Sequence, residues 1–207
     1  YRCNEQEHVI LFVMHHIVSD GWSLGVLWRE LSQLYKDRML GKQVDKSPLQ
    51  HQYVDFARWQ KERLQGSFLS EKIDYWKKKL DDVPTQLVLP ADRARPRRQS
   101  SKGGEVSRTI NDRLIEGLRQ IGWDNRASLF MVFHAALAVL LYRYTGQSDI
   151  LVGVPVAGRL HRASEKMMGL FINALPFRMS VKGEDTFLTT LAKARQTALD
   201  GFTHQDI

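Results

Sequence analysis

Residues 8–34, HVILFVMHHIVSDGWSLGVLWRELSQL, contain the pattern that decides the fold class. The run over residues 8–14 is almost purely apolar and rich in valine and isoleucine, which predicts a buried strand. Leucines and a tryptophan then recur at helical spacing over residues 24–34, with Ser23 as the expected N-terminal cap and Gly41 as the expected end. The stretch therefore predicts a strand, a histidine-rich loop and a helix.

The rest of the chain alternates between helical and strand patterns in the same way. The expected helices cover residues 49–64 (ending at Gly66), 73–80, 112–121 (capped by Asp112), 129–144 (capped by Ser128) and 186–199 (opened by Thr186), and the expected strands cover residues 106–110, 149–156 and 171–181. Residues 87–102 carry prolines and arginines and are expected to be an exposed connection. Because strands and helices are mixed along the chain, the predicted fold class is α/β.

The composition excludes several classes of protein. Apolar residues make up 43% of the 207 residues, which is ordinary globular usage, and a single cysteine excludes a disulfide framework and favours a reducing compartment. No signal peptide is visible, and the longest apolar run, over residues 129–142, is interrupted by His134 and too short for a bilayer. The chain starts at Tyr1 and stops directly after a helical pattern, so both ends are expected to be cut through a longer protein.

The net charge of +7 needs a separate interpretation. The basic residues gather at residues 77–79 and at Arg93, Arg95, Arg97, Arg98 and Lys102. Nucleic-acid binding would require such charge beside aromatic residues or within a known module, and neither is visible. We therefore expect a solvated surface, or a face that meets an acidic protein partner.

The loop over residues 14–23 carries the residues best suited to chemistry. Neighbouring side chains of an extended backbone point to opposite faces, so only one of His15 and His16 can face a given cavity. Histidine suits proton transfer near neutral pH, Asp20 can hold the loop, and Gly21 lets a backbone N–H approach a carbonyl. A metal site would need further ligands, which no second cluster supplies. From the residues alone, catalysis and a structural role remain equally open.

Residues 15–21, HHIVSDG, match the HHxxxDG signature of the condensation domains of nonribosomal peptide synthetases. Further segments resemble the family's motifs in the family's order: residues 53–59 (YVDFARW, for YxDFAxW), residues 89–93 (LPADR, at the lobe crossing), residues 169–173 (GLFIN, for GxFVNT) with Arg178, and residues 204–206 (HQD, for HQDxPFE). Ala174 stands where the family usually has threonine. Several ordered motifs make a chance resemblance very improbable.

The resemblance implies parts of two chloramphenicol-acetyltransferase-like lobes, which form a V around a central tunnel. Residues 1–88 would be the end of the N-terminal lobe, residues 89–103 the lobe crossing, and residues 104–207 the first part of the C-terminal lobe. Because the family's other motifs are missing, we expect an internal fragment of one domain. Produced alone, this fragment is expected to fold poorly and to be inactive.

The resemblance also implies a role for each residue of the loop. His16 takes the place of the catalytic histidine, and His15 is expected to face the interior and hold the loop. Asp20 is expected to pair with an arginine, either Arg159 or one outside these 207 residues. Gly21 is expected near the thioester carbonyl, and the expected tunnel-lining residues are Trp22, Ser23 and Asn173.

The implied enzyme forms an amide bond by attack of a carrier-bound aminoacyl amine on an upstream carrier-bound thioester. Substrates would arrive on the 4′-phosphopantetheine of two peptidyl carrier domains beside an adenylation domain, with no directly bound cofactor or metal. The order Gly21-Trp22-Ser23 favours peptide-bond formation, and the loop resembles the subtype that joins two L-configured residues. A stand-alone acyltransferase and a non-catalytic docking module are the alternatives. We expect a cytoplasmic protein with no nucleic-acid or membrane partner.

Overall fold

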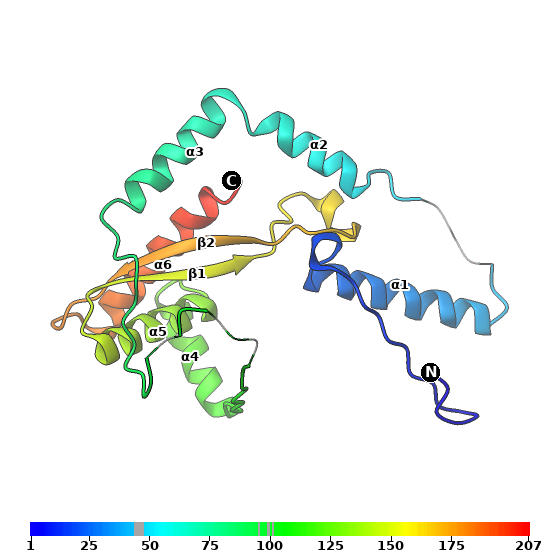
Figure 1. Cartoon of the computed structure of the whole chain (residues 1–207), viewed down its shortest axis with the longest axis horizontal. Coiled ribbons are helices and arrows are strands. Elements are labelled where there is room, and N and C mark those ends of the chain that lie inside the picture. Colours follow the sequence, from blue (N-terminus) through cyan, green and yellow to red (C-terminus); the bar gives the residue numbers. More distant parts are fainter. Residues whose placement is uncertain (44–47, 95, 99, 101) are drawn as a thin grey trace. The chain divides into compact units, whose positions relative to one another are not determined.

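The computed structural model describes residues 1–43, 48–94, 96–98, 100 and 102–207, so Arg95 of the basic cluster lies outside the described residues. Helices and two paired strands form a mixed α/β structure (Figure 1). The chain divides into two compact units. The first unit contains residues 1–71, 155–174 and 206–207, and the second contains residues 72–154 and 175–205.

The first unit contains the histidine-rich loop and the helices that follow it. Its elements are the 3-10 helix η1 (His16–Val18), α1 (Gly21–Met39), α2 (Tyr53–Arg63), the start of α3 (Gly66–Lys79) and the 3-10 helix η2 (Arg162–Lys166). The expected helix over residues 24–34 is confirmed, but Ser23 is not its cap. Asp20 caps α1, because its side chain precedes the first helical residue and accepts the backbone N–H of Ser23.

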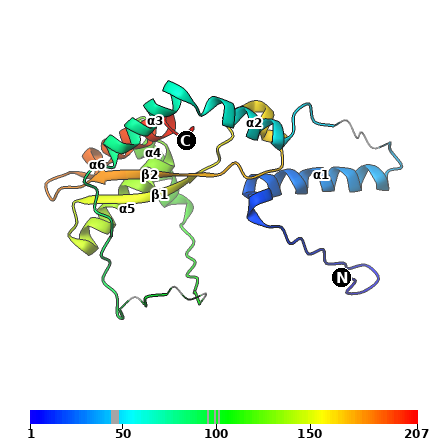
Figure 2. The same cartoon turned by 45° about the horizontal axis from the view of Figure 1, so that its top comes forward.

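The apolar run before this loop is extended, but the prediction of a buried strand is wrong. A single bridge joins Arg2 to His8, and the side chains of residues 9–13 are exposed, up to 85% for Val13. The segment is an extended trace, and no described strand pairs with it (Figures 1 and 2). The apolar sequence favours burial, but a strand is buried only where neighbouring strands cover it and pair its backbone.

The second unit contains most of the regular structure. Its elements are the end of α3, α4 (Asp112–Asp124), α5 (Leu129–Thr145), β1 (Asp149–Val156), β2 (Asn173–Ser180) and α6 (Phe187–Thr203), with the last residues of β1 and the first of β2 in the first unit. The strands pair with each other, and α5 packs against both α4 and α6. The caps Ser128 and Thr186 are confirmed.

Two expectations fail near the start of this unit. The cap of α4 is Asn111 rather than Asp112, because the Asn111 side chain accepts the N–H of Leu114. Residues 106–110 form no strand, and Val106 is exposed. Their alternating pattern specifies a face to bury, but no described strand pairs with them.

The core of the second unit follows directly from sequence periodicity. Along β2 the alternate residues Leu175, Phe177 and Met179 are buried, as expected for side chains on one face of a strand. Leu191, Ala194 and Ala198 of α6 recur at helical spacing and are buried as well. Apolar residues of α5 complete the core, so both helices present one apolar face to it.

Within the described residues, no single helix has the length and apolar character needed to cross a membrane. The pair α4 and α5 reaches that length and composition only jointly, with a bend of 100° between the two helices.

Candidate active site

The two adjacent histidines lie at the start of η1, where the chain leaves the extended segment. His15 is exposed rather than directed to the interior, and its Nδ1 accepts the backbone N–H of Ile17 at 3.1 Å. It therefore holds the loop by capping η1, not by packing inside the protein. His16 is also exposed, and no described residue forms a hydrogen bond with its side chain.

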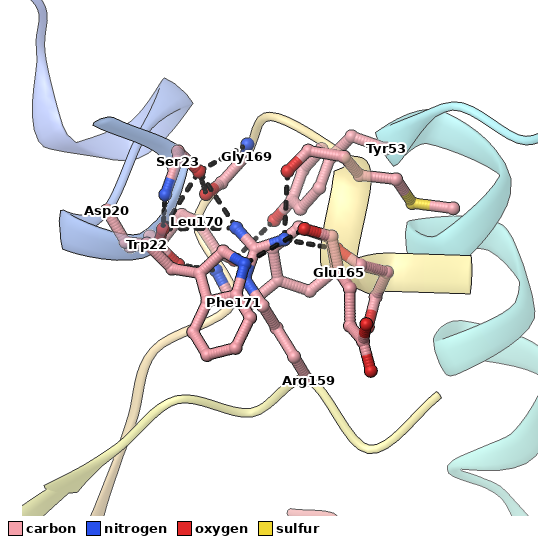
Figure 3. Close-up of polar contacts among 11 residues, drawn as sticks. Asp20, Trp22, Ser23, Tyr53, Arg159, Glu165, Gly169, Leu170 and Phe171 are labelled. Carbon is pink, nitrogen blue, oxygen red and sulfur yellow. Dashed lines mark hydrogen bonds and ion pairs between the residues drawn. The ribbon is translucent and has the colours of Figure 1, made fainter. Parts of the chain in front are cut away.

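Asp20 is buried, with 4% of its side chain exposed, and its carboxylate is surrounded by donors (Figure 3). Oδ1 accepts the N–H of Ser23 at 2.8 Å and a guanidinium N–H of Arg159 at 3.1 Å, and Oδ2 accepts the N–H of Phe171 at 3.0 Å. Burial alone would raise the pKa of Asp20, but these hydrogen bonds outweigh it and hold the pKa below its ordinary value. The carboxylate is thus ionised and fully engaged.

Arg159 supplies the positive charge that compensates Asp20. It lies in the loop after β1, and only 2% of its side chain is exposed. Nη2 bonds to Asp20, while Nη1 donates to the carbonyls of Ser164 and Met167, the latter at 2.8 Å. Of the two alternatives that the sequence left open, the structure therefore contains the Asp20–Arg159 ion pair.

Aromatic rings enclose the guanidinium of Arg159. Its Cζ lies 4.0 Å from the ring centroid of Phe171 and 5.7 Å from that of Trp22. The Trp22 indole N–H donates to the carbonyl of Glu165 at 2.9 Å, which fixes the ring although the residue is 46% exposed. These rings favour the cation and keep water away from the ion pair.

Ser23 was expected to line a tunnel, but it is completely buried. Its hydroxyl oxygen lies 2.8 Å from Asp20 Oδ1 and 2.9 Å from the carbonyl of Gly169. The same oxygen accepts the N–H of Gly169 at 3.1 Å and an N–H of Arg159 at 2.9 Å. Ser23 therefore joins the start of α1 to the GLFIN segment, residues 169–173 (Figure 3).

The remaining site candidates lie at the ends of elements. Gly21 is the first residue of α1, where backbone N–H groups have no partner within the helix. Asn173 begins β2, its side-chain amide donates to the carbonyl of Ile207, and its Oδ1 accepts the N–H of Ala174 at 2.8 Å. The expected roles of Gly21, Trp22 and Asn173 toward substrate stay predictions.

Sequence reasoning missed how the motifs meet in space. The Tyr53 hydroxyl at the start of α2 donates to the carbonyl of Leu170 at 2.8 Å, and the Tyr53 ring meets Phe171 edge-on with centroids 5.1 Å apart. A Cβ atom at Gly169 would overlap the Tyr53 ring, so this position requires glycine. The only available signal was that both segments are family motifs, and the sequence alone did not say that they touch.

In the loop that contains the site, the buried carboxylate of Asp20 is neutralised by Arg159, and the imidazole of His16 is exposed. Among the described residues no group of three or more histidine, cysteine, aspartate or glutamate side chains could hold a metal ion. Asp20 accepts bonds from four donor groups, so it serves as a structural anchor. The catalytic role expected of His16 stays a prediction.

Comparison with known proteins identifies the family of the whole chain. The model of the Condensation domain family matches residues 1–207. The chain is 43% identical over 203 residues to a linear gramicidin synthase of Brevibacillus parabrevis, a match that covers 98% of this chain and 3% of the relative. It is 38% identical over 205 residues to a plipastatin synthase of Bacillus subtilis, a match that covers 99% of this chain and 8% of the relative. The chain thus spans less than a tenth of the length of either relative.

Solved structures of similar fold cover most of this chain. The X-domain in its complex with OxyB from teicoplanin biosynthesis has a TM-score of 0.83 at 29% identity, over 93% of this chain and 44% of that one. The SgcC5 protein of Streptomyces globisporus has a TM-score of 0.77 at 30% identity, over 92% of this chain and 43% of that one. The first condensation domain of the CDA synthetase, at 23% identity and a TM-score of 0.76, shares the mixed α/β fold. With its ordered motifs and its match over residues 1–207, the chain belongs to the condensation-domain family.

Proposed function

We propose that the domain containing these residues forms an amide bond in a nonribosomal peptide synthetase. The acceptor is an aminoacyl group and the donor a peptidyl or acyl thioester, each held by a carrier domain. Support comes from the ordered motifs and from relatives that are named as gramicidin and plipastatin synthases. The domain is therefore an acyltransferase that forms peptide bonds.

One observation carries this proposal: the carboxylate of the HHxxxDG loop is held in an ion pair, whereas the second histidine of the loop has no hydrogen-bond partner among the described residues. Asp20 is buried against Arg159, while His16 is exposed with no hydrogen-bond partner among the described residues. A group that transfers a proton must be able to reach the substrate. We therefore assign different roles to the two residues: Asp20 holds the backbone of the loop, and His16 faces the reactants.

The reaction requires one bond to form and one to break. The acceptor's α-amine attacks the thioester carbon, the C–N bond forms, the C–S bond breaks, and the sulfur leaves as a thiol. The proton that the amine loses ends on the departing sulfur. His16 either accepts it first and then gives it to the sulfur, or orients the amine before attack. An α-amine has a pKa of about 7.7–8.0, so part of it is already neutral near pH 7 and positioning contributes much of the acceleration.

The N-terminus of α1 is suited to the charge that develops on the thioester oxygen. Gly21 is the first helical residue, where free N–H groups and the helix dipole favour negative charge. In the proposed full domain, Trp22 and Asn173 line the path of the substrates. The two proposed lobes, residues 1–88 and residues 104–207, surround this path, and residues 89–103 cross between them.

The proposed partners are two peptidyl carrier domains and an adenylation domain of the same synthetase. The carriers deliver both substrates on 4′-phosphopantetheine, so the domain itself needs no resident cofactor. A four-domain nonribosomal peptide synthetase bound to AMP and glycine is among the structures of similar fold. The basic residues of this chain suit a surface that meets acidic carrier domains.

The test is His16→Ala in the complete domain within its synthetase, with both carriers loaded. Formation of the dipeptidyl carrier is followed by intact-protein mass spectrometry. We expect turnover to fall by about 10²–10⁴-fold, the usual contribution of one acid–base group, without complete loss.

The control is His161→Ala, which removes an exposed histidine of the same unit that has no assigned role. This variant is expected to keep wild-type turnover. Unchanged turnover in His16→Ala would remove the catalytic assignment. A wild-type protein that loads both carriers and forms no amide would instead overturn the proposed reaction.

A further inference from the structure

We propose that Ser23 is a positioning residue, which fixes His16 by fastening the start of α1 to the GLFIN segment. The inference rests on the function proposed above, because it concerns the same reaction. It replaces the expectation that Ser23 lines a tunnel, since the side chain is completely buried.

The Ser23 hydroxyl uses all of its hydrogen-bonding capacity. A hydroxyl has one proton to donate and two lone pairs to accept with. The lone pairs receive the N–H of Gly169 and an N–H of Arg159, at 3.1 and 2.9 Å. The proton points to Asp20 Oδ1 or to the Gly169 carbonyl, at 2.8 and 2.9 Å. Removing this oxygen leaves buried groups on two separate segments without a partner.

Asp20 and Ser23 hold the GLFIN segment at different residues. Oδ2 of Asp20 accepts the N–H of Phe171, whereas Gly169 bonds to Ser23 alone in this network. The Tyr53 ring packs closely against Gly169, and its hydroxyl donates to the carbonyl of Leu170 at 2.8 Å, so α2 also holds the segment. Ser23 thus fastens α1 to a part of the molecule that is itself held.

The path from Ser23 to His16 is short. Asp20 accepts the N–H of Ser23, Ser19 is buried, and the N–H of Ser19 bonds to the carbonyl of His16 at 3.3 Å. A shift at the start of α1 therefore moves η1 and with it the imidazole of His16. A misplacement of about 1 Å in an active site can cost about 10²-fold in rate.

The test is a double-mutant cycle in the complete domain, with Ser23→Ala, His16→Ala and the double variant. We expect Ser23→Ala to lower kcat by about 10–100-fold, while the KM for the loaded acceptor carrier stays within about twofold. If Ser23 acts through His16, the double variant is no slower than His16→Ala alone. A role in stability alone would leave kcat per folded molecule unchanged.

Ser23→Cys gives a second measurement that does not depend on how well the alanine variant folds. It fills the same space with a weaker hydrogen-bonding group, and we expect kcat to fall about tenfold, again without a further loss beside His16→Ala. Ser32→Ala, the same change at an exposed site of α1, is the matched control and should keep wild-type kinetics.

The inference is overturned if Ser23→Ala and Ser23→Cys keep kcat within about twofold. It is also overturned if their losses simply add to that of His16→Ala. A failure of the proposed function is distinguishable from both, because it would show as unchanged turnover in His16→Ala or as no amide formation by the wild-type domain.

Discussion

Three buried polar or charged side chains, Asp20, Arg159 and Ser23, meet in the first unit, whereas the buried side chains of β2, α5 and α6 in the second unit are mostly apolar. Asp20, Arg159 and Ser23 meet through hydrogen bonds of defined direction. Phe177 and Leu191, by contrast, are buried apolar side chains that contact their neighbours by van der Waals packing. The two regions are therefore sensitive to different changes.

The polar network and the apolar core stabilise the chain by different kinds of interaction. Buried polar networks fix geometry, but each member is costly to leave without its partner. Apolar cores tolerate changes of chemistry better than changes of volume, because they are packed as densely as crystals. The loop around Asp20 uses a polar network, and the core of the second unit uses apolar packing.

Removing the charge of Arg159 should have the largest effect. Arg159→Ala leaves the Asp20 carboxylate buried without its partner, which costs about 3–5 kcal/mol of unfolding free energy. Hydrogen exchange of the complete domain should show loss of protection at the start of α1 and in the GLFIN segment, with α5 and α6 unchanged. Arg162→Ala, at an exposed arginine nearby, is the control. Equal protection in both variants would mean that the ion pair does not hold the first unit.

Adding a single methyl group should give an intermediate effect in the second unit. A Cβ atom at Gly201 would lie 2.6 Å from the Phe177 ring, which is held by Phe130, His134 and Phe202. We expect Gly201→Ala to cost about 1–3 kcal/mol in urea unfolding. Gly117→Ala in α4 meets no atom within 4 Å and should instead gain about 0.5–1 kcal/mol. A gain in both variants would show that the core is loosely packed.

Acidification should give the smallest change in stability. As the pH falls, the second unit should lose stability before the first. Burial lowers the pKa of His134 from 6.5, so below pH 6.5 the unfolded chain binds more protons than the folded chain. The stability of the second unit should therefore fall as the pH drops below 6.5 and level off below the folded-state pKa. Asp20 has a pKa below its ordinary value of 3.8, so its contribution is complete above about pH 4 and is lost only as the pH falls through the folded-state value.

Hydrogen exchange at pH 7.5 and 5.5 measures this difference. Protection of α5 should fall at pH 5.5, while that of the GLFIN segment should hold. His134→Gln should abolish the dependence in α5, and His161→Gln, at an exposed site, should leave it intact. An equal loss in both units would contradict the assignment to His134.

The regular elements of the second unit were predictable because their signals are local. Ser128 and Thr186 cap the helices that their positions indicate, and β1 has the predicted bounds. Residues 8–14 were misjudged because burial of a strand depends on partners that no local pattern specifies. The caps Asp20 and Asn111 were missed by a few residues, since several nearby side chains could fill the same position.

The candidate site was predictable as a motif but not as a geometry. The Asp20–Arg159 pair was one of two alternatives, and 139 residues separate the partners along the chain. Neither the burial of Ser23 nor its bonds to Gly169 could be inferred, because serine at the start of a helix usually indicates a cap. Only the fold brings these segments together.

The exposed run over residues 9–13 has a consequence for the behaviour of this chain in solution. These five residues are all apolar, they include no charge, proline or glycine, and the backbone of residues 10–13 is unpaired in the described structure. That combination is typical of segments that add to one another edge to edge in cross-β aggregates. The apolar side chains and unpaired backbone that suit this run to the interior of a sheet also allow it to pair with the same run of a second molecule. Such pairing is favoured in concentrated solutions.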